Sequence, residues 1–225
     1  NEISDQLQNE IERELKNNNL LNCDVAVRSS GLDEDSKEHS FAGMFSSFLF
    51  QNGMKSIERS IRECWASAYS ERCLEYRHKN NLSLEGIGMG VVIQKMVDSD
   101  VSGVMFTRNP IDQVDHDGVI IESLFGQCEG LVCGEFEADH YRVDRETGSY
   151  KVTTVSKTEK YKKKVGDVGL EKVSVSSSLI NTESLSEVEV KSLLSLANKI
   201  ENYFGAPMDI EWSIEKGELY VVQMR

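Results

Sequence analysis

The residues best suited to chemistry gather at the end of the chain, in residues 209–225. Polar and apolar residues alternate from Asp209 to Ile214, which is the period of a half-buried strand. A second strand-like run extends from Leu219 to Arg225, and the short segment between the two runs favours a turn. The sequence therefore predicts a β-hairpin here.

A three-residue loop, Lys216 to Glu218, would fix the register of this hairpin. Glu211 would then lie opposite Gln223, and Asp209 opposite Arg225. The other face would carry three pairs: Trp212 with Val222, Ile210 with Met224, and Ile214 with Tyr220. Two carboxylates, an amide and a guanidinium on one face are costly to bury unpaired, but they suit a divalent cation and the phosphates around it. The alternative is an ordinary amphipathic hairpin with a solvated polar face.

Composition excludes several classes of protein. The 225 residues are 39% hydrophobic and 28% charged with two prolines, which is typical of a soluble globular protein with one large domain or two small ones. A net charge of −13 argues against nucleic-acid binding, and no apolar run approaches a membrane span. The polar, acidic start does not resemble a secretory signal. Five cysteines without a Cys-x-x-Cys pair indicate free thiols, so we expect a cytoplasmic protein. From the charge and the lack of a long apolar run, we expect neither nucleic acid nor membrane as a partner.

The segments that must position these residues alternate between helical and extended patterns. Helices are expected over residues 4–18 and 54–80, and strands over 23–28, 91–97, 103–106, 119–123 and 140–144. A capping box at Ser186 and Glu189 opens a further helix that runs to Phe204, and Gly205 ends it. Residues 146–183 are the least regular, and the basic residues within 157–164 are expected in a solvated loop. Because no βαβ rhythm appears, the fold class is predicted as α+β.

Two other segments could contact phosphate or a nucleotide. Arg28, at the end of a strand, can clamp phosphate oxygens, and Gly43 in Phe-Ala-Gly-Met-Phe-Ser-Ser lets the backbone approach a ligand closely. Each segment could equally be a turn beside a strand. Gln94 could present its amide to a nucleotide or be a solvated strand residue.

Seven motifs in order resemble those of a known family. They are Val25-Ala-Val-Arg-Ser-Ser30, Ser40-Phe-Ala-Gly43, Gln94-Lys-Met-Val97, Ser102-Gly-Val-Met-Phe-Thr107, Phe125-Gly-Gln-Cys-Glu129, Pro207-Met-Asp-Ile-Glu-Trp212 and Val222-Gln-Met-Arg225. This order is similar to the nucleotide-binding module of phosphoenolpyruvate synthase and pyruvate phosphate dikinase, which rifampicin phosphotransferases share. The resemblance covers nearly the whole chain.

The resemblance implies an ATP-grasp fold, in which ATP lies between two α+β subdomains. Residues 1–22 would be a remnant helix of the N-terminal lobe, and residues 23–225 the nucleotide-binding subdomain. Carried over by position, it implies the following roles: Arg28 and Arg225 contact ATP phosphates, Gly43 and Ser47 lie on the phosphate-covering loop, Gln94 lies beside the adenine, Glu211 and Gln223 bind Mg²⁺ and phosphate, and Asp209 is a nearby metal-site carboxylate. Arg28, Asp209 and Arg225 would be the catalytic residues.

The sequence departs from the family pattern in places. Ser47 stands where relatives often have threonine, and Gly126-Gln-Cys-Glu129 stands for their Gly-Leu-Gly-Glu. The glycine-rich segment with an ATP-contacting lysine, which precedes the Val-Arg-Ser-Ser strand in relatives, has no counterpart here, and nor does a phosphohistidine motif. We therefore expect the isolated chain to be inactive, with a surface that could support a homo-oligomer.

The resemblance implies an ATP- and Mg²⁺-dependent phosphotransferase module of a larger dikinase-like enzyme. Its partners would be a phosphohistidine swivelling domain and the N-terminal lobe of the same enzyme. The acceptor would be a carrier histidine or a small molecule. A direct kinase acting on an amide, hydroxyl or antibiotic is an alternative, and a nucleotide-binding regulatory module without catalysis is another.

Overall fold

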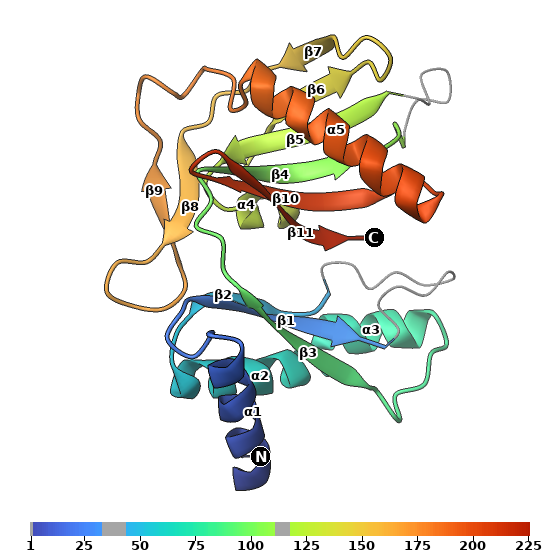
Figure 1. Cartoon of the computed structure of the whole chain (residues 1–225). Helices are drawn as coiled ribbons and strands as arrows, with labels where there is room; N and C mark the ends of the chain where they lie inside the picture. The colour runs from blue at the N-terminus through green and yellow to red at the C-terminus, as the bar shows by residue number, and fades with distance from the viewer. Residues whose placement is uncertain (1, 33–43, 111–117) are drawn as a thin grey trace. The chain divides into compact units, whose positions relative to one another are not determined.

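The computed structural model describes residues 2–32, 44–110 and 118–225 (Figure 1). Its helices are α1 (Asp5–Asn17), α2 (Met54–Ser67), α3 (Glu71–Lys79), α4 (Glu129–Val132) and α5 (Glu187–Phe204). Its strands are β1 (Val25–Gly31), β2 (Ser47–Gln51), β3 (Met89–Lys95), β4 (Val101–Phe106), β5 (Val119–Phe125), β6 (Asp139–Val143), β7 (Tyr150–Thr153), β8 (Glu159–Lys163), β9 (Leu170–Ser174), β10 (Asp209–Glu215) and β11 (Glu218–Met224). Helices and antiparallel strand pairs confirm the α+β class.

The chain divides into two compact units. The first unit comprises Asn1–Met96 with Lys163–Leu170, and the second comprises Val97–Lys162 with Glu171–Arg225. Helix α1 therefore belongs to the same unit as β1–β3, and the chain first passes from one unit to the other after Met96. The predicted domain boundary after residue 22 stays a prediction.

The first unit is built on a three-stranded sheet in the order β2-β1-β3. Val25 and Val27 of β1 are fully buried and pack with Ile57 and Ile61 of α2. Because side chains alternate along a strand, this packing directs the intervening residues of β1 to the opposite face of the sheet.

The single helix expected over residues 54–80 is wrong, because two helices occupy this segment. Helix α2 ends at Ser67, and Ser70 caps α3 by accepting a hydrogen bond from the Cys73 amide. A serine that can cap a new helix competes with continuation of the old one. The apolar stripe continues through both helices, so periodicity alone could not reveal the break.

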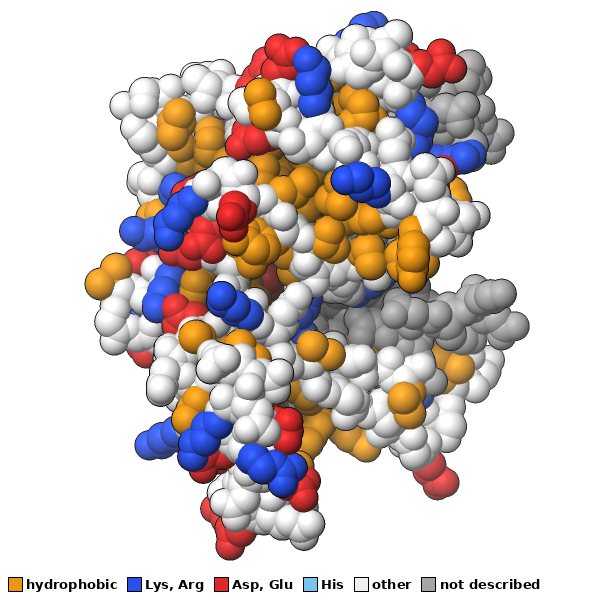
Figure 2. Space-filling view, viewed as in Figure 1, with side chains coloured by type: hydrophobic (Ala, Val, Ile, Leu, Met, Phe, Trp, Pro, Cys, Tyr) orange, Lys and Arg blue, Asp and Glu red, His pale blue; other side chains and the backbone are white. Residues whose placement is uncertain are grey.

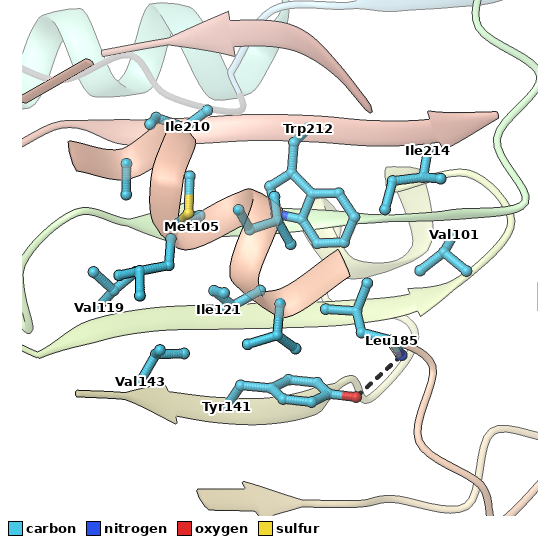
Figure 3. Close-up of a cluster of buried hydrophobic side chains, with 14 of the residues drawn as sticks. Val101, Met105, Val119, Ile121, Tyr141, Val143, Leu185, Ile210, Trp212 and Ile214 are labelled. Carbon is cyan, nitrogen blue, oxygen red and sulfur yellow. Dashed lines mark hydrogen bonds between the residues drawn. The ribbon is translucent and has the colours of Figure 1, made fainter. Parts of the chain in front are cut away.

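The second unit is built on a six-stranded sheet in the order β11-β10-β4-β5-β6-β7, with α5 packed across one face (Figure 1). Figure 3 shows the core between them, where Ile210, Trp212 and Ile214 of β10 point to the same side. Gly103 of β4 lies opposite Trp212, and a Cβ there would meet the Glu122 carbonyl at 1.9 Å and the indole at 2.8 Å. Only glycine leaves room for this packing.

Helix α5 begins and ends where the sequence predicts. The Ser186 side chain accepts from the Glu189 amide, the Glu189 carboxylate accepts from the Ser186 amide at 2.7 Å, and Gly205 ends the helix with φ 69°. The five predicted strands are also present, with their ends shifted by a few residues. Residues 146–183, expected to be irregular, contain β7 and the two-stranded β8–β9 sheet.

On the surface seen in Figure 2, acidic and basic side chains are interspersed with apolar ones. None of the helices within the described ranges combines the length and apolar character that crossing a membrane requires. All five cysteines are free thiols, as expected.

Candidate functional site

The closing hairpin, β10–β11, brings the four predicted residues of the second unit together. Glu211 pairs with Gln223. Asp209 and Arg225 exchange two backbone hydrogen bonds of 2.8 Å, so they also lie opposite one another. Both predicted outer pairs are confirmed. We call these four side chains the polar face of the hairpin.

Of the three pairs predicted for the other face, Ile210 with Met224 is confirmed, and the other two are wrong by one residue. The loop has two residues rather than three, with Lys216 at φ 52° and Gly217 at φ 80°, as in a type I′ turn. Trp212 therefore pairs with Val221 and Ile214 with Leu219. The register shifts between Glu211 and Trp212, because β11 carries one extra residue in a β-bulge. The bulge cancels the shorter loop and restores the outer pairs.

The polar face points away from α5. Ile210, Trp212 and Ile214 fill the core beneath the helix, so Asp209 and Glu211, which alternate with them, lie on the other side of the sheet. Burial and the negative charge of Glu211 raise the pKa of Asp209, and the charge of Arg225 opposes that rise. Two neighbouring carboxylates that repel each other favour a bound cation.

The sequence did not single out Glu122, which lies on this same side of the sheet. Val104 of β4 pairs with both Glu211 and Glu122, so the two glutamates lie two strands apart, about 10 Å. His140 Nδ1 lies 3.6 Å from the Glu122 carboxylate. A lone charged residue in the apolar run Val-Ile-Ile-Glu-Ser-Leu was the available signal.

Within the described part of the chain, no group of three or more His, Cys, Asp or Glu side chains could hold a metal ion. The spacing of Glu122 from Glu211 is one reason. Mg²⁺ does not need such a cage, because one or two carboxylates and substrate phosphates commonly complete its coordination. Asp209, Glu211 and the Gln223 amide fit that pattern.

The first unit places three further predicted residues on one face of its sheet. Arg28 pairs with Ser47, and Gln94 pairs with Ala26, two residues before Arg28. Paired residues and alternate residues share a face, so Arg28, Ser47 and Gln94 lie together on the side away from α2. Gly43 lies outside the described residues. The structure thus gathers those predicted residues that it describes into one set in each unit.

Gln127, in the segment Gly126-Gln-Cys-Glu129 after β5, belongs to a buried hydrogen-bond network. Its Nε2 donates to the Val97 carbonyl at 3.0 Å, and its Oε1 accepts from the Ser99 hydroxyl at 3.3 Å. The Ser99 hydroxyl also accepts from the Ser213 hydroxyl, with the two oxygens 2.9 Å apart. Gln127 is 3% exposed and both ends of its amide are satisfied, which is what a buried amide requires. Buried hydrogen bonds therefore hold this loop in place.

Residues 1–225 match the family model described as pyruvate phosphate dikinase, AMP/ATP-binding domain. The chain belongs to this family. The resemblance inferred from the ordered motifs is confirmed, and the domain's description makes the chain part of an ATP- or AMP-binding module.

Curated relatives of the pyruvate phosphate dikinase family carry different names. A probable phosphoenolpyruvate synthase of Methanothermobacter thermautotrophicus is 36% identical over 202 residues, which is 89% of this chain and 29% of that protein. A rifampicin phosphotransferase of Bacillus cereus is 36% identical over 200 residues, covering 89% and 23%. A prodigiosin synthesizing transferase of Serratia marcescens is 31% identical over 201 residues, covering 89% and 22%. The chain spans less than a third of the length of these relatives.

Proposed function

We propose that the chain is an ATP-grasp module that binds MgATP for phosphoryl transfer within a larger, dikinase-like enzyme. The observation that carries the proposal is the polar face of the hairpin. It combines two like-charged carboxylates, one with a raised pKa, with an amide and an arginine. Membership of an AMP/ATP-binding family supports a nucleotide as the source of the phosphates.

Each residue of the polar face has a role in this proposal. Asp209, Glu211 and Gln223 would hold Mg²⁺, and Arg225 would contact the phosphates. When bound, Mg²⁺ neutralises phosphate charge. Phosphoryl transfer depends mostly on positioning and on neutralising charge, so arginines and carboxylates on a rigid sheet are suitable equipment.

The set in the first unit supports the same proposal from nucleotide chemistry. We assign Arg28 to the ATP phosphates, Gly43 and Ser47 to the segment covering them, and Gln94 to the adenine. Guanidinium groups bind phosphate oxygens with paired hydrogen bonds, and an amide can both donate to and accept from a base.

The acceptor is proposed as either a carrier histidine or a small molecule. A dikinase passes a phosphate on through a histidine of a swivelling domain, whereas a direct kinase uses the acceptor itself. The rifampicin phosphotransferase and prodigiosin synthesizing transferase relatives favour keeping the small-molecule acceptor as the second candidate. Whether the full-length enzyme produces AMP or ADP from ATP separates the two chemistries.

The metal assignment is tested by titrating the chain with Mn²⁺ and a non-hydrolysable ATP analogue, followed by electron paramagnetic resonance. Glu211→Ala should weaken binding by about a hundredfold, equivalent to about 3 kcal/mol. Glu218→Ala removes the same side chain from the turn end of the hairpin and should bind like the wild type. In the full-length enzyme, Glu211→Ala should abolish metal-dependent turnover, and activity within about tenfold of wild type would refute the assignment.

A regulatory module would bind MgATP without turnover in the full-length enzyme. Isothermal titration calorimetry of MgATP into the chain, alone and with an added N-terminal lobe, tests both ideas together. Absence of binding in both arrangements would exclude the phosphotransferase and the regulatory module alike.

A further inference from the structure

Thr107 lies directly after β4, beside the residue that precedes Asp209. Its amide donates to the Met208 carbonyl at 2.9 Å, as in an antiparallel ladder. In a regular ladder the Met208 amide would donate back to the Thr107 carbonyl. Here it donates instead to the Thr107 hydroxyl, also at 2.9 Å. The side chain of Thr107 thus takes the place of its own backbone carbonyl.

The carbonyl released by this exchange has a different partner. Nη2 of Arg145 donates to it, and the same atom lies 3.0 Å from the Glu201 carboxylate on α5. Arg108 binds the other Glu201 oxygen at 2.8 Å. Burial acts to raise the pKa of Glu201, but Arg108, the Thr107 side chain and Arg145 outweigh it and hold that pKa below its usual range. The carboxylate therefore stays charged and holds both arginines.

These contacts fix the start of β10 from two sides. Met208 is held by Thr107 through both its amide and its carbonyl, and Asp209 is held by Arg225 through both of its backbone groups. Thr107 is fully buried, so water does not compete for these hydrogen bonds. The direction in which the Asp209 side chain leaves the sheet therefore depends on two sets of hydrogen bonds, those between Thr107 and Met208 and those between Arg225 and Asp209.

We propose that Thr107 is a positioning residue that fixes Asp209 for metal and phosphate binding on the polar face of the hairpin. The proposal rests on the proposed function of that face and assigns a specific task to the Thr107 hydroxyl. Because the Thr107 hydroxyl accepts from the Met208 amide, the Thr107 carbonyl is available to Arg145. Arg145 also binds Glu201, so these contacts connect the start of β10 to α5.

The test compares Thr107→Val and Thr107→Ser with the wild-type chain in the Mn²⁺–nucleotide titration. Valine keeps the shape but removes the hydroxyl, and leaves the Met208 amide without its acceptor. T107V should raise the dissociation constant of Mn²⁺ about fivefold to tenfold and broaden its resonance spectrum, whereas T107S should stay within about twofold of wild type. Equal affinities for T107V and wild type would overturn the proposal.

A matched control separates positioning from general loss of stability. Ser184 is also buried, and its hydroxyl donates to Asp139 at 2.7 Å, three strands away from β10. Ser184→Ala should lower the melting temperature and leave the Mn²⁺ dissociation constant unchanged. A comparable rise in the S184A dissociation constant would show that T107V acts only through stability, and would refute the positioning role.

Three further outcomes are decisive. If T107V does not fold, Glu201→Gln tests the same contacts from α5, with an expected rise of about twofold to threefold, and an unchanged constant would overturn the proposal. If Glu211→Ala binds like wild type, the polar face is not a metal site and the proposed function fails. If Glu211→Ala loses binding but T107V does not, only the role of Thr107 fails.

Discussion

Asp139 and Asp209 are both aspartates of the six-stranded sheet, but their surroundings differ in kind. Asp139 is fully buried, and four groups donate to it: Lys157 Nζ at 2.5 Å, the Val155 amide at 3.0 Å, the Ser184 amide at 2.8 Å and the Ser184 hydroxyl at 2.7 Å. Such a carboxylate is compensated from within the fold.

Asp209 is half-buried, and the nearest charge on its own strand is another carboxylate. Burial and Glu211 raise its pKa, while Arg225 opposes the rise. A carboxylate that stabilises the fold is thus surrounded by donors from the chain itself. One that serves binding keeps an electrostatic cost that a ligand can relieve.

The largest effect is expected at the Asp139 pair. Lys157→Met should leave a charged carboxylate buried without its cation, and should lower the free energy of unfolding by about 3–5 kcal/mol. Urea denaturation measures the change. The double variant Asp139→Asn/Lys157→Met should recover part of the loss, because it also removes the orphaned charge. A loss below about 1 kcal/mol for Lys157→Met would show that the pair contributes little.

Asp209→Asn should act in the opposite sense on stability. Removing one of two repelling carboxylates should leave the melting temperature of the metal-free chain unchanged or raise it by about 1–3 °C. The affinity for Mn²⁺ with nucleotide should fall about tenfold, because a negative charge beside the cation is lost. Asp144→Asn, at the turn after β6, is the matched control and should leave that affinity unchanged. Destabilisation without loss of affinity would place Asp209 in the same class as Asp139.

The raised pKa of Asp209 gives the pH dependence a definite sign. The folded chain holds this proton more tightly than the unfolded chain does, so the stabilising contribution is complete below the unfolded pKa and is lost as pH rises through the folded pKa. Mn²⁺ must displace the same proton, so its affinity should rise with pH from the ordinary aspartate range through the raised value. Titrations at several pH values should show a shallower slope for Asp209→Asn, and equal slopes would contradict this origin.

The sequence predicts the polar face correctly but not how the hairpin achieves it. The outer pairs depend on two errors that cancel: the loop is one residue shorter than expected, and the β-bulge adds one residue to β11. Lys216 at a positive φ is an unusual residue for a type I′ turn, so the common Asn-Gly signal was absent. Alternation identifies which residues share a face, but it does not identify the turn type.

Lys157 shows a different limit. It lies within the basic segment expected to be a solvated loop, yet it is only 4% exposed. Its partner Asp139 is 18 residues away in the sequence. Asp139 begins a strand and Lys157 lies in a loop, and only the packing of the folded chain brings the two side chains together. The role of the Thr107 side chain could not be predicted for the same reason, because its hydroxyl accepts from the Met208 amide, 101 residues later. Local patterns find the members of a face, but long-range hydrogen bonds appear only in the folded chain.

The smallest effect is expected at the turn end of the hairpin. Lys216 adopts φ 52°, where asparagine is more favourable than lysine, so Lys216→Asn should raise the free energy of unfolding by about 0.5 kcal/mol. Lys216→Val should lower it by about 1 kcal/mol, because a β-branched residue is strained at positive φ.

The turn lies about 20 Å along β10 from Asp209, so the Mn²⁺ dissociation constants of both Lys216 variants should stay within about twofold of wild type. Urea denaturation and the Mn²⁺ titration together check this separation. A larger change in affinity would mean that turn geometry is transmitted along the strands to the polar face. Stability and binding would then be coupled within one hairpin. The separation between residues that stabilise the fold, such as Asp139, and residues that bind a ligand, such as Asp209, would hold for single side chains but not for whole strands.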